Sequence, residues 1–268
     1  MRPLKFIGII GDPIEQTLSP KMQNAAFRKG NLPFVYLPFR VRREELGDFL
    51  QKAPSKGLVG LNVTIPHKER IIRHLDRISP EARAIGAVNT VIIQEGRLSG
   101  YNTDAEGYLR SLKEETGFKP KGKRILILGA GGAARALITG LRRAGAREIY
   151  LANRTKKKVL KIATMPLQKT SLKSLPPIDL LINATPVGLN GTRFRWLPLS
   201  SMRRGAIISD LVYRPLMTPL LKEAKKKGFK IHTGLGMLLH QGAESFRLWT
   251  GRRPDLAVMK KRLLASLR

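Results

Sequence analysis

Short apolar runs alternate with helix-patterned segments in the N-terminal part of the chain. Four of these runs have the length of a strand, at residues 4–10, 34–39, 58–64 and 87–93. After the first run, Ser19 and Pro20 predict the start of a helix, with Ser19 as its N-cap and Pro20 as its first residue. Pro66 predicts the start of a second helix. This alternation is typical of an α/β domain.

A second alternation begins where a short buried strand, residues 124–128, leads directly into a glycine-rich turn, Gly129 to Ala134. Residues 135–144 have helical periodicity after this turn. Further strands are predicted over residues 148–152, 179–183, 206–211 and 229–232, with a helix over residues 217–227. The order strand, glycine turn, helix is typical of a dinucleotide-binding βαβ domain. Two helices, over residues 237–249 and 254–267, close the chain, and their pattern alone does not place them in either part.

Composition excludes several kinds of chemistry. The 268 residues include no cysteine, which removes disulfides, thiolate nucleophiles and cysteine-based metal sites. Four scattered histidines are too few to suggest a metal, so we expect none. The apolar runs are far shorter than the roughly 18 residues of a membrane helix, and Gly11-Asp12-Pro13 interrupts the N-terminal run before a signal peptide forms. We therefore expect a cytoplasmic protein without a membrane partner.

The charge is the unusual feature, because 50 Lys and Arg face 19 Asp and Glu and give a net charge of +31. Such an excess favours a polyanionic partner, or an enzyme with anionic small-molecule ligands. Residues 105–238 contain 27 of the basic and 7 of the acidic side chains, so the excess lies mostly on the predicted nucleotide-binding half. Aromatic residues make up only 6%, and no nucleic-acid recognition motif accompanies the charge, so we expect no nucleic-acid partner.

The glycine-rich turn predicts a cofactor site. Gly129 can make the tight turn, Gly131 lets the backbone approach a pyrophosphate, and the helix N-terminus presents free N–H groups to it. NAD enzymes place an acidic residue at the end of the next strand. Here Asn153-Arg154-Thr155 and three lysines, residues 156–158, stand at that point. A guanidinium, a hydroxyl and ammonium groups suit a 2′-phosphate, so we predict NADP(H).

Small polar residues follow the predicted strands of the N-terminal half. They form the clusters Thr17-Leu18-Ser19, Asn62-Val63-Thr64-Ile65-Pro66-His67-Lys68, Gly86-Ala87-Val88-Asn89-Thr90 and Asn102-Thr103-Asp104. Polar groups at strand ends of α/β sheets converge on one crevice. Hydroxyls, amides, one ammonium and one carboxylate in such a crevice suit a polyhydroxylated carboxylic acid as substrate.

Together with the glycine turn and Asn153-Arg154-Thr155, these clusters occur in the order found in the shikimate dehydrogenase family, which the chain resembles over almost its whole length. Three later motifs complete the resemblance: Asn183-Ala184-Thr185-Pro186-Val187-Gly188, Asp210-Leu211-Val212-Tyr213 and Gly234-Leu235-Gly236-Met237-Leu238-Leu239-His240-Gln241. The resemblance implies an N-terminal α/β substrate-binding and catalytic domain (residues 1–104, completed by helices in 239–268). It also implies a Rossmann-like NADP-binding domain, residues 105–238, with a cleft between the two.

The resemblance also implies a reaction and the residues that perform it. The reaction is the reversible NADPH-dependent reduction of 3-dehydroshikimate to shikimate in aromatic amino-acid biosynthesis, by a monomer or homodimer. Lys68 and Asp104 would form the acid–base pair. The implied substrate-binding residues are Thr17, Ser19, Asn62, Thr64, Asn89, Tyr213 and Gln241. The implied cofactor-binding residues are Gly129, Ala130, Gly131, Gly132, Ala133, Asn153, Arg154, Thr155, Lys158, Thr185, Leu211 and Gly234.

Three departures from the family keep other interpretations open. Thr17 stands where the family has serine, and Gln16 precedes it in place of histidine, which leaves a quinate/shikimate dehydrogenase with relaxed substrate or cofactor use as the alternative. The span from Asn153 to Asn183 is short, which predicts that the second helix and third strand of the cofactor domain are trimmed. The charge leaves a polyanion-binding protein without enzyme activity as a third interpretation.

Overall fold

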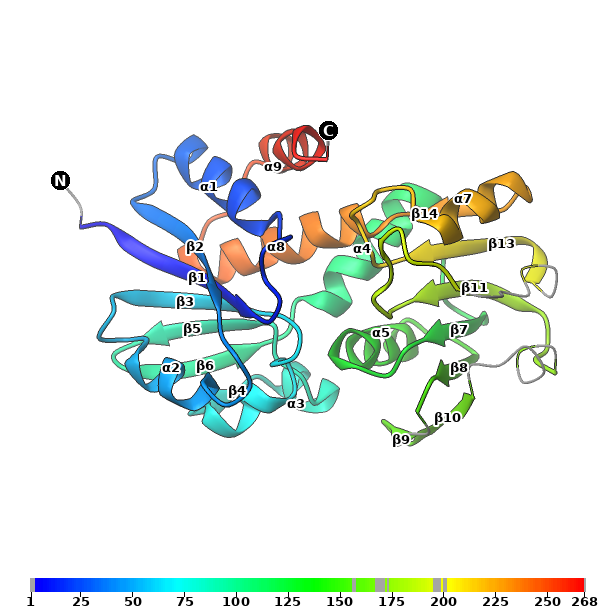
Figure 1. Ribbon diagram of the computed structural model, residues 1–268, viewed down its shortest axis with the longest axis horizontal. Helices are drawn as coiled ribbons and strands as arrows, with labels where there is room; N and C mark the ends of the chain where they lie inside the picture. Colours follow the sequence, from blue (N-terminus) through cyan, green and yellow to red (C-terminus); the bar gives the residue numbers. More distant parts are fainter. Residues whose placement is uncertain are drawn as a thin grey trace. The chain divides into compact units, whose positions relative to one another are not determined.

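The computed structural model describes residues 3–155, 158–166, 172, 174–194, 199 and 202–267. These residues divide into two compact units (Figure 1). The first unit contains the chain up to Asp104 together with Leu239–Ser266, and the second contains Ala105–Leu238. Within the described residues, no helix is both long enough and apolar enough to span a bilayer.

The first unit is built on a six-stranded sheet in the order β2-β1-β3-β5-β6-β4. Its strands are β1 Lys5–Gly11, β2 Phe34–Arg40, β3 Leu58–Val63, β4 Arg77–Ile78, β5 Thr90–Gln94 and β6 Arg97–Tyr101. Its helices are α1 Ser19–Lys29, α2 Leu46–Lys52, the 3-10 helix η1 Arg70–His74, α3 Pro80–Ile85 and α9 Leu256–Ala265. β1 lies parallel to β2 and β3, whereas β5 pairs antiparallel with β3 and β6. α1 and α9 lie side by side (Figure 1).

Two helix starts in this unit differ from the sequence prediction. α1 begins at Ser19, so the N-cap is Leu18, whose backbone is itself helical and whose side chain is 1% exposed. Ser19 is therefore inside the helix, and its N–H donates to Thr17 Oγ1 (3.3 Å). Pro66 does not open a helix either. The N–H of His67 bonds back to the carbonyl of Thr64 in a turn, and only η1 follows.

The second unit contains a seven-stranded sheet in the order β14-β13-β11-β7-β8-β10-β9, which runs from top to bottom in Figure 1. Six strands are parallel, and in chain order they follow the arrangement 3-2-1-4-5-6 of dinucleotide-binding domains. They are β7 Arg124–Leu128, β8 Glu148–Asn153, β10 Ile162–Pro166, β11 Ile178–Asn183, β13 Met202–Asp210 and β14 Lys230–His232. The short strand β9 Lys158–Val159 pairs antiparallel with β10.

Helices cover both faces of this sheet. α4 Asp104–Thr116 and α5 Gly132–Arg143 pack on one face, where Tyr108 and Leu137 join a core with Ile125 and Ile127. α7 Pro219–Lys226 packs on the other face against a core that includes Leu126. Because neighbouring residues of a strand point to opposite faces, a strand covered on both sides has apolar residues at successive positions, as β7 has from Ile125 to Leu128 after Arg124 at its start. α8 Gly234–Thr250 begins in the second unit and ends in the first, and β12 Val187–Asn190 follows β11.

The second helix and third strand of this unit were predicted to be trimmed. The third strand is present as β10, a strand of five residues that pairs with β8 through Thr164 and Met165. In the described residues between β8 and β10 the chain contains only β9 and turns, and no helix. As far as this segment is described, the shortened span lacks a helix between β8 and β10, while the sheet keeps its strand.

Candidate active site

Lys68 and Asp104 form a close ion pair in the first unit. Lys68 Nζ lies 2.5 Å from Asp104 Oδ2. The Lys68 side chain follows the turn after β3 and is 16% exposed, whereas Asp104 is the first residue of α4 and is 4% exposed. In such a largely buried place a charge-assisted hydrogen bond is stronger than in water. The structure thus brings together the two side chains that were expected to act as a pair.

The carboxylate of Asp104 is oriented by two asparagines. Asn89 Nδ2 donates to Asp104 Oδ1 (2.8 Å), and the backbone N–H of Asp104 donates to Asn102 Oδ1 (3.0 Å). Both carboxylate oxygens accept hydrogen bonds, Oδ1 from Asn89 and Oδ2 from Lys68, and the N-terminus of α4 adds a favourable dipole. Asn89 is itself held, because its Oδ1 accepts from the N–H of Thr103 (2.9 Å).

Asn62, an expected substrate ligand, uses its amide inside the unit. Its side chain is 5% exposed, and Oδ1 accepts from the hydroxyl of Tyr36 (2.7 Å). Nδ2 donates to the carbonyl of Asn89 (3.0 Å) and to Ser245 Oγ on α8 (3.1 Å). Both ends of the amide are thus occupied by protein, which makes Asn62 a support for Asn89. Sequence reasoning gave Tyr36 and Ser245 no role, since neither belongs to a polar strand-end cluster.

The other expected substrate ligands are divided between the units. Thr17, Thr64 and Gln241 are half-buried and Ser19 is 4% exposed, all in the first unit. Tyr213 follows β13 in the second unit.

The glycine-rich turn of the second unit has the geometry that a phosphate group needs. Gly129 follows β7 with φ +107°, and a Cβ there would lie 2.9 Å from the carbonyl oxygen of Ala184, so only glycine fits. Gly131 is the N-cap of α5, where no side chain of the described residues caps the helix. A Cβ on Gly131 would meet no described atom within 4 Å. Open space therefore lies over the N–H groups of a helix start, where a pyrophosphate fits.

The tip after β8 has the composition expected for a 2′-phosphate site. Asn153 Nδ2 donates to the carbonyl of Thr155 (2.8 Å), which folds the tip into a turn. Arg154 and Thr155 are exposed there. Lys156 and Lys157 lie outside the described residues, and Lys158 begins β9 but its side chain is not among those described. An exposed guanidinium at this tip fits NADP(H).

The remaining expected cofactor residues stand at the carboxyl ends of β11 and β13. Asn183, the last residue of β11, accepts at Oδ1 from the N–H (3.0 Å) and the hydroxyl (2.6 Å) of Thr185. The N–H of Leu211 donates to the carbonyl of Asn183 (3.0 Å). Gly234 packs so tightly on Leu211 that a Cβ would collide with its carbonyl. Ligands of open α/β sheets bind at this edge.

Asp210, the last residue of β13, is a buried acid to which sequence reasoning gave no role. Its carboxyl accepts from Asn183 Nδ2 (2.8 Å) and from the hydroxyl of Thr218 (2.7 Å). Burial raises the pKa of Asp210 to about 6, and these hydrogen bonds oppose the rise. Its place beside Tyr213 in one motif was the only signal in the sequence.

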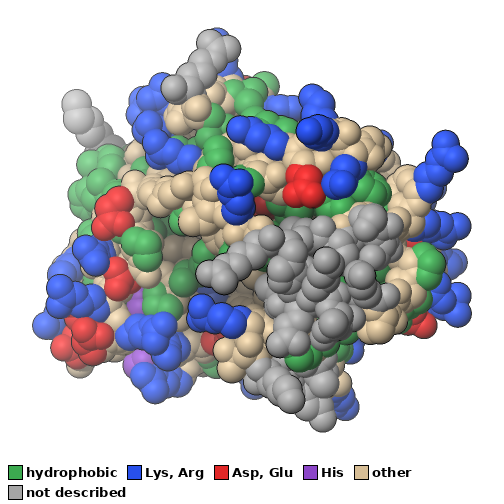
Figure 2. Space-filling model, turned by 45° about the vertical axis from the view of Figure 1, so that its right-hand side comes forward, with side chains coloured by type: hydrophobic (Ala, Val, Ile, Leu, Met, Phe, Trp, Pro, Cys, Tyr) green, Lys and Arg blue, Asp and Glu red, His purple; other side chains and the backbone are tan. Residues whose placement is uncertain are grey.

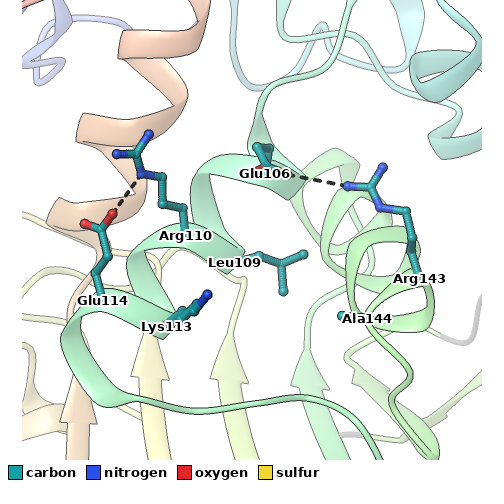
Figure 3. A pocket seen from close by; sticks show the side chains of 7 residues that line it. All are labelled: Glu106, Leu109, Arg110, Lys113, Glu114, Arg143 and Ala144. Carbon is teal, nitrogen blue, oxygen red and sulfur yellow. Dashed lines mark hydrogen bonds and ion pairs between the residues drawn. The ribbon is translucent and has the colours of Figure 1, made fainter.

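A separate surface hollow of about 590 Å³ lies between α4 and α5 (Figure 3). Its charged side chains pair with one another, Arg110 with Glu114 (2.8 Å) and Arg143 with Glu106 (3.6 Å). None of the expected site residues is in its lining, which consists of Glu106, Leu109, Arg110, Lys113, Glu114, Arg143 and Ala144.

Positive charge is spread over the face of the molecule that Figure 2 shows. Lys and Arg side chains are scattered across the face shown in Figure 2, and few acidic side chains stand between them. With 50 basic and 19 acidic side chains, the chain has 31 more cations than anions.

Comparisons with known proteins agree over almost the whole chain. Family models match residues 9–91 (shikimate dehydrogenase substrate binding domain), 111–192 (shikimate / quinate 5-dehydrogenase) and 234–264 (shikimate 5'-dehydrogenase C-terminal domain). The chain is 45% identical to a shikimate dehydrogenase (NADP(+)) of Geobacter metallireducens, over 98% of this chain and 97% of the relative. It is 44% identical to the enzyme of that name from Methanopyrus kandleri, over 98% and 96%. The solved structure of shikimate 5-dehydrogenase from Thermus thermophilus, in complex with NADP(H) and shikimate, is 40% identical with a TM-score of 0.88, over 98% of this chain and 100% of that one.

Proposed function

The chain belongs to the shikimate dehydrogenase family, and we propose that Lys68 and Asp104 are the acid–base pair of its reaction. That reaction is the reversible NADPH-dependent reduction of 3-dehydroshikimate to shikimate, an oxidoreductase step of the shikimate pathway. One observation carries the assignment of the pair: the contact of 2.5 Å between Lys68 Nζ and Asp104 Oδ2, within a buried network of asparagines.

NADPH supplies the hydride when it is bound, and the protein must manage the proton and the charge on the substrate oxygen. The ammonium of Lys68 has three N–H donors, of which one points to Asp104, so the others are able to reach a substrate oxygen. Lys68 donates a proton to this oxygen in the reduction and takes it back in the oxidation. Asp104 holds the ammonium and accepts from the substrate hydroxyl, and the positive charge of Lys68 stabilises the developing alkoxide.

The remaining polar side chains fix the orientation of the substrate. Thr17 and Ser19, with Tyr213 of the second unit, bind the carboxylate. Thr64 and Gln241 bind ring hydroxyls. Asn89 was expected to do so as well, but it is 1% exposed and its amide donates to Thr103 and Asp104, so its part is to orient Asp104. The amide of Asn62 donates to the backbone carbonyl of Asn89, so the contribution of Asn62 to substrate binding is indirect.

The second unit has the residues to hold NADP(H). The N–H groups at the start of α5, over the turn of Gly129, Ala130, Gly131, Gly132 and Ala133, bind the pyrophosphate. Asn153, Arg154 and Thr155 bind the adenosine ribose and its 2′-phosphate, with Lys158 as a further cation. Thr185, Leu211 and Gly234 line the rest of the cofactor site.

Steady-state kinetics with a Lys68→Ala protein test the assignment of the pair. We expect shikimate oxidation with NADP⁺ to fall by about 10²- to 10⁴-fold in kcat, the usual contribution of a positioned acid–base group. Lys113→Ala is the matched control. It removes a lysine of α4 that lines the surface hollow, outside the proposed site, and should keep the wild-type rate. A Lys68→Ala protein with a near-normal rate would show that the proton moves by another route.

The quinate alternative rests on two neighbouring departures from the family, the extra methyl of Thr17 and Gln16 in place of histidine. Comparing kcat/KM for shikimate and quinate, each with NADP⁺ and with NAD⁺, separates the two interpretations. We expect shikimate with NADP⁺ to be the best pair. Arg154→Gln should narrow the preference for NADP⁺ over NAD⁺ by about tenfold, the effect of one charge-assisted contact. A clear preference for quinate would favour the alternative.

A further inference from the structure

Asp210 is buried without a cation beside it. Its side chain is 0% exposed, and no Lys, Arg or His of the described residues forms an ion pair with it. Three donors compensate: Asn183 Nδ2 (2.8 Å) and the N–H of Val212 (3.0 Å) bond to Oδ1, and the hydroxyl of Thr218 (2.7 Å) bonds to Oδ2. Burying a carboxyl in this way costs free energy. A serine or an asparagine at this position would cost less free energy to bury. The presence of a carboxyl with three hydrogen bonds therefore calls for an explanation.

The three bonds join three separate segments at the carboxyl edge of the sheet. Asn183 ends β11, Val212 belongs to the segment after β13, and Thr218 is the N-cap of α7. Asn183 in turn fixes the position of Thr185, because Asn183 Oδ1 accepts hydrogen bonds from both the N–H and the hydroxyl of Thr185. Its Nδ2 also donates to the carbonyl of Val187 (2.7 Å), so the amide cannot rotate without losing bonds at both ends.

We propose that Asp210 is a positioning residue for the cofactor half of the site. Through Asn183 it sets the direction of the Thr185 hydroxyl, and through the N–H of Val212 it holds the segment that contains Leu211. The inference rests on the proposed function, which assigns Thr185 and Leu211 to NADP(H). Asp210 itself touches neither substrate nor cofactor in this proposal.

The neighbouring residue provides a matched control. Ser209 is also 0% exposed and lies on the same strand, but its hydroxyl faces the other side of the sheet. There it contacts His232 Nδ1 (2.8 Å) and accepts from the hydroxyl of Tyr108 (3.1 Å). Changing either side chain loosens β13, but only Asp210 reaches the segments that carry Thr185 and Leu211.

The test is direct binding of NADP⁺ in the absence of shikimate, by calorimetric titration well below the unfolding temperature. Asp210→Asn keeps the size of the side chain but loses the charge and one acceptor. We expect its Kd for NADP⁺ to rise about tenfold, with KM for NADP⁺ rising in parallel and kcat at saturation falling by less than about threefold. Ser209→Ala should lower the unfolding midpoint while leaving Kd within about twofold. Equal destabilisation of both variants with an unchanged Kd would overturn the proposal.

A double-mutant cycle tests the route through Asn183. Thr185→Val should weaken NADP⁺ binding by several-fold in the native protein and by clearly less in the Asp210→Asn background, because the hydroxyl it removes is already misplaced there. If the fold-change in Kd of the double variant equals the product of the two single fold-changes, the two residues are independent and the proposed coupling is overturned. If Asp210→Asn does not fold, Thr218→Val removes the bond to Oδ2 together with the N-cap bond from the N–H of Leu221 (3.3 Å), and it should raise Kd by about two- to fourfold. A protein that shows this coupling but does not oxidise shikimate would contradict only the proposed function.

Discussion

The proposed sites of the two units are built in opposite ways. In the first unit, side chains hold one another: Lys68 pairs with Asp104, Asp104 with Asn89, and the backbone of Asn89 with Asn62. In the second unit, the glycine turn depends on the absence of side chains, because a Cβ on Gly129 would lie 2.9 Å from the carbonyl oxygen of Ala184 and Gly131 leaves open space where phosphate is expected. We therefore expect the network of the first unit to lose activity when one of its side chains is changed. We expect the glycine turn to lose NADP⁺ binding when a side chain is added.

The largest effect should come from removing the charge at the centre of the first network. Asp104→Asn keeps the volume of the side chain but leaves the ammonium of Lys68 without its counter-ion in a place that is only 16% exposed. We expect kcat for shikimate oxidation to fall about 10³-fold, within the range of a lost acid–base partner, while Kd for NADP⁺ stays within twofold. A loss in NADP⁺ binding as large as the loss in kcat would show that the two halves are not independent.

A pair of glycine variants examines the second half. Gly129→Ala places a Cβ 2.9 Å from the carbonyl of Ala184 at φ +107°. It should cost about 1–2 kcal/mol in unfolding free energy and abolish most NADP⁺ binding. Gly131→Ala meets no described atom within 4 Å, so its unfolding free energy should change by less than about 0.5 kcal/mol. Its Kd for NADP⁺ should nevertheless rise by tenfold or more, because the methyl group occupies the space for the phosphate. If Gly131→Ala binds NADP⁺ normally, the pyrophosphate does not lie over this turn.

The same contrast explains which parts of the fold could be predicted from the sequence. β7 was predicted with its observed bounds, since a strand covered on both faces shows an unbroken apolar run, here Ile125 to Leu128. β6 was missed because Arg97–Tyr101 contains only one strongly apolar side chain, Leu98, and the strand is defined by its antiparallel pairing with β5. The start of α1 was displaced by one residue because buried Leu18 already has a helical backbone.

For the site, local motifs located the residues but not their partners. The spacing from Asn62 to Lys68 marks both as site residues. That Asn62 is occupied by Tyr36, 26 residues away, and by Ser245, 183 residues away, follows only from the fold. A glycine motif is different, since its requirement is a local backbone shape that the sequence states directly. Asp210 is like Asn62 in this respect, because its three donors come from separate segments and follow only from the fold.

The smallest expected effect concerns two buried groups of the second unit, His232 and Asp210, that titrate with opposite signs. Burial lowers the pKa of His232 to about 4, below its ordinary 6.5, so stability from this group is lost as pH falls below 6.5. The raised pKa of Asp210, about 6 against an ordinary 3.8, means that its contribution is lost as pH rises through 6 and returns on acidification. Between pH 7 and pH 5 the titration of His232 costs about 2 kcal/mol and that of Asp210 returns about 1 kcal/mol, so the unfolding free energy of the native protein should change little.

Urea unfolding at the two pH values separates the two groups. On going from pH 7 to pH 5, His232→Gln should gain stability and Asp210→Asn should lose about 2 kcal/mol. Equal pH dependence in both variants would mean that neither group titrates in the folded state as its burial requires.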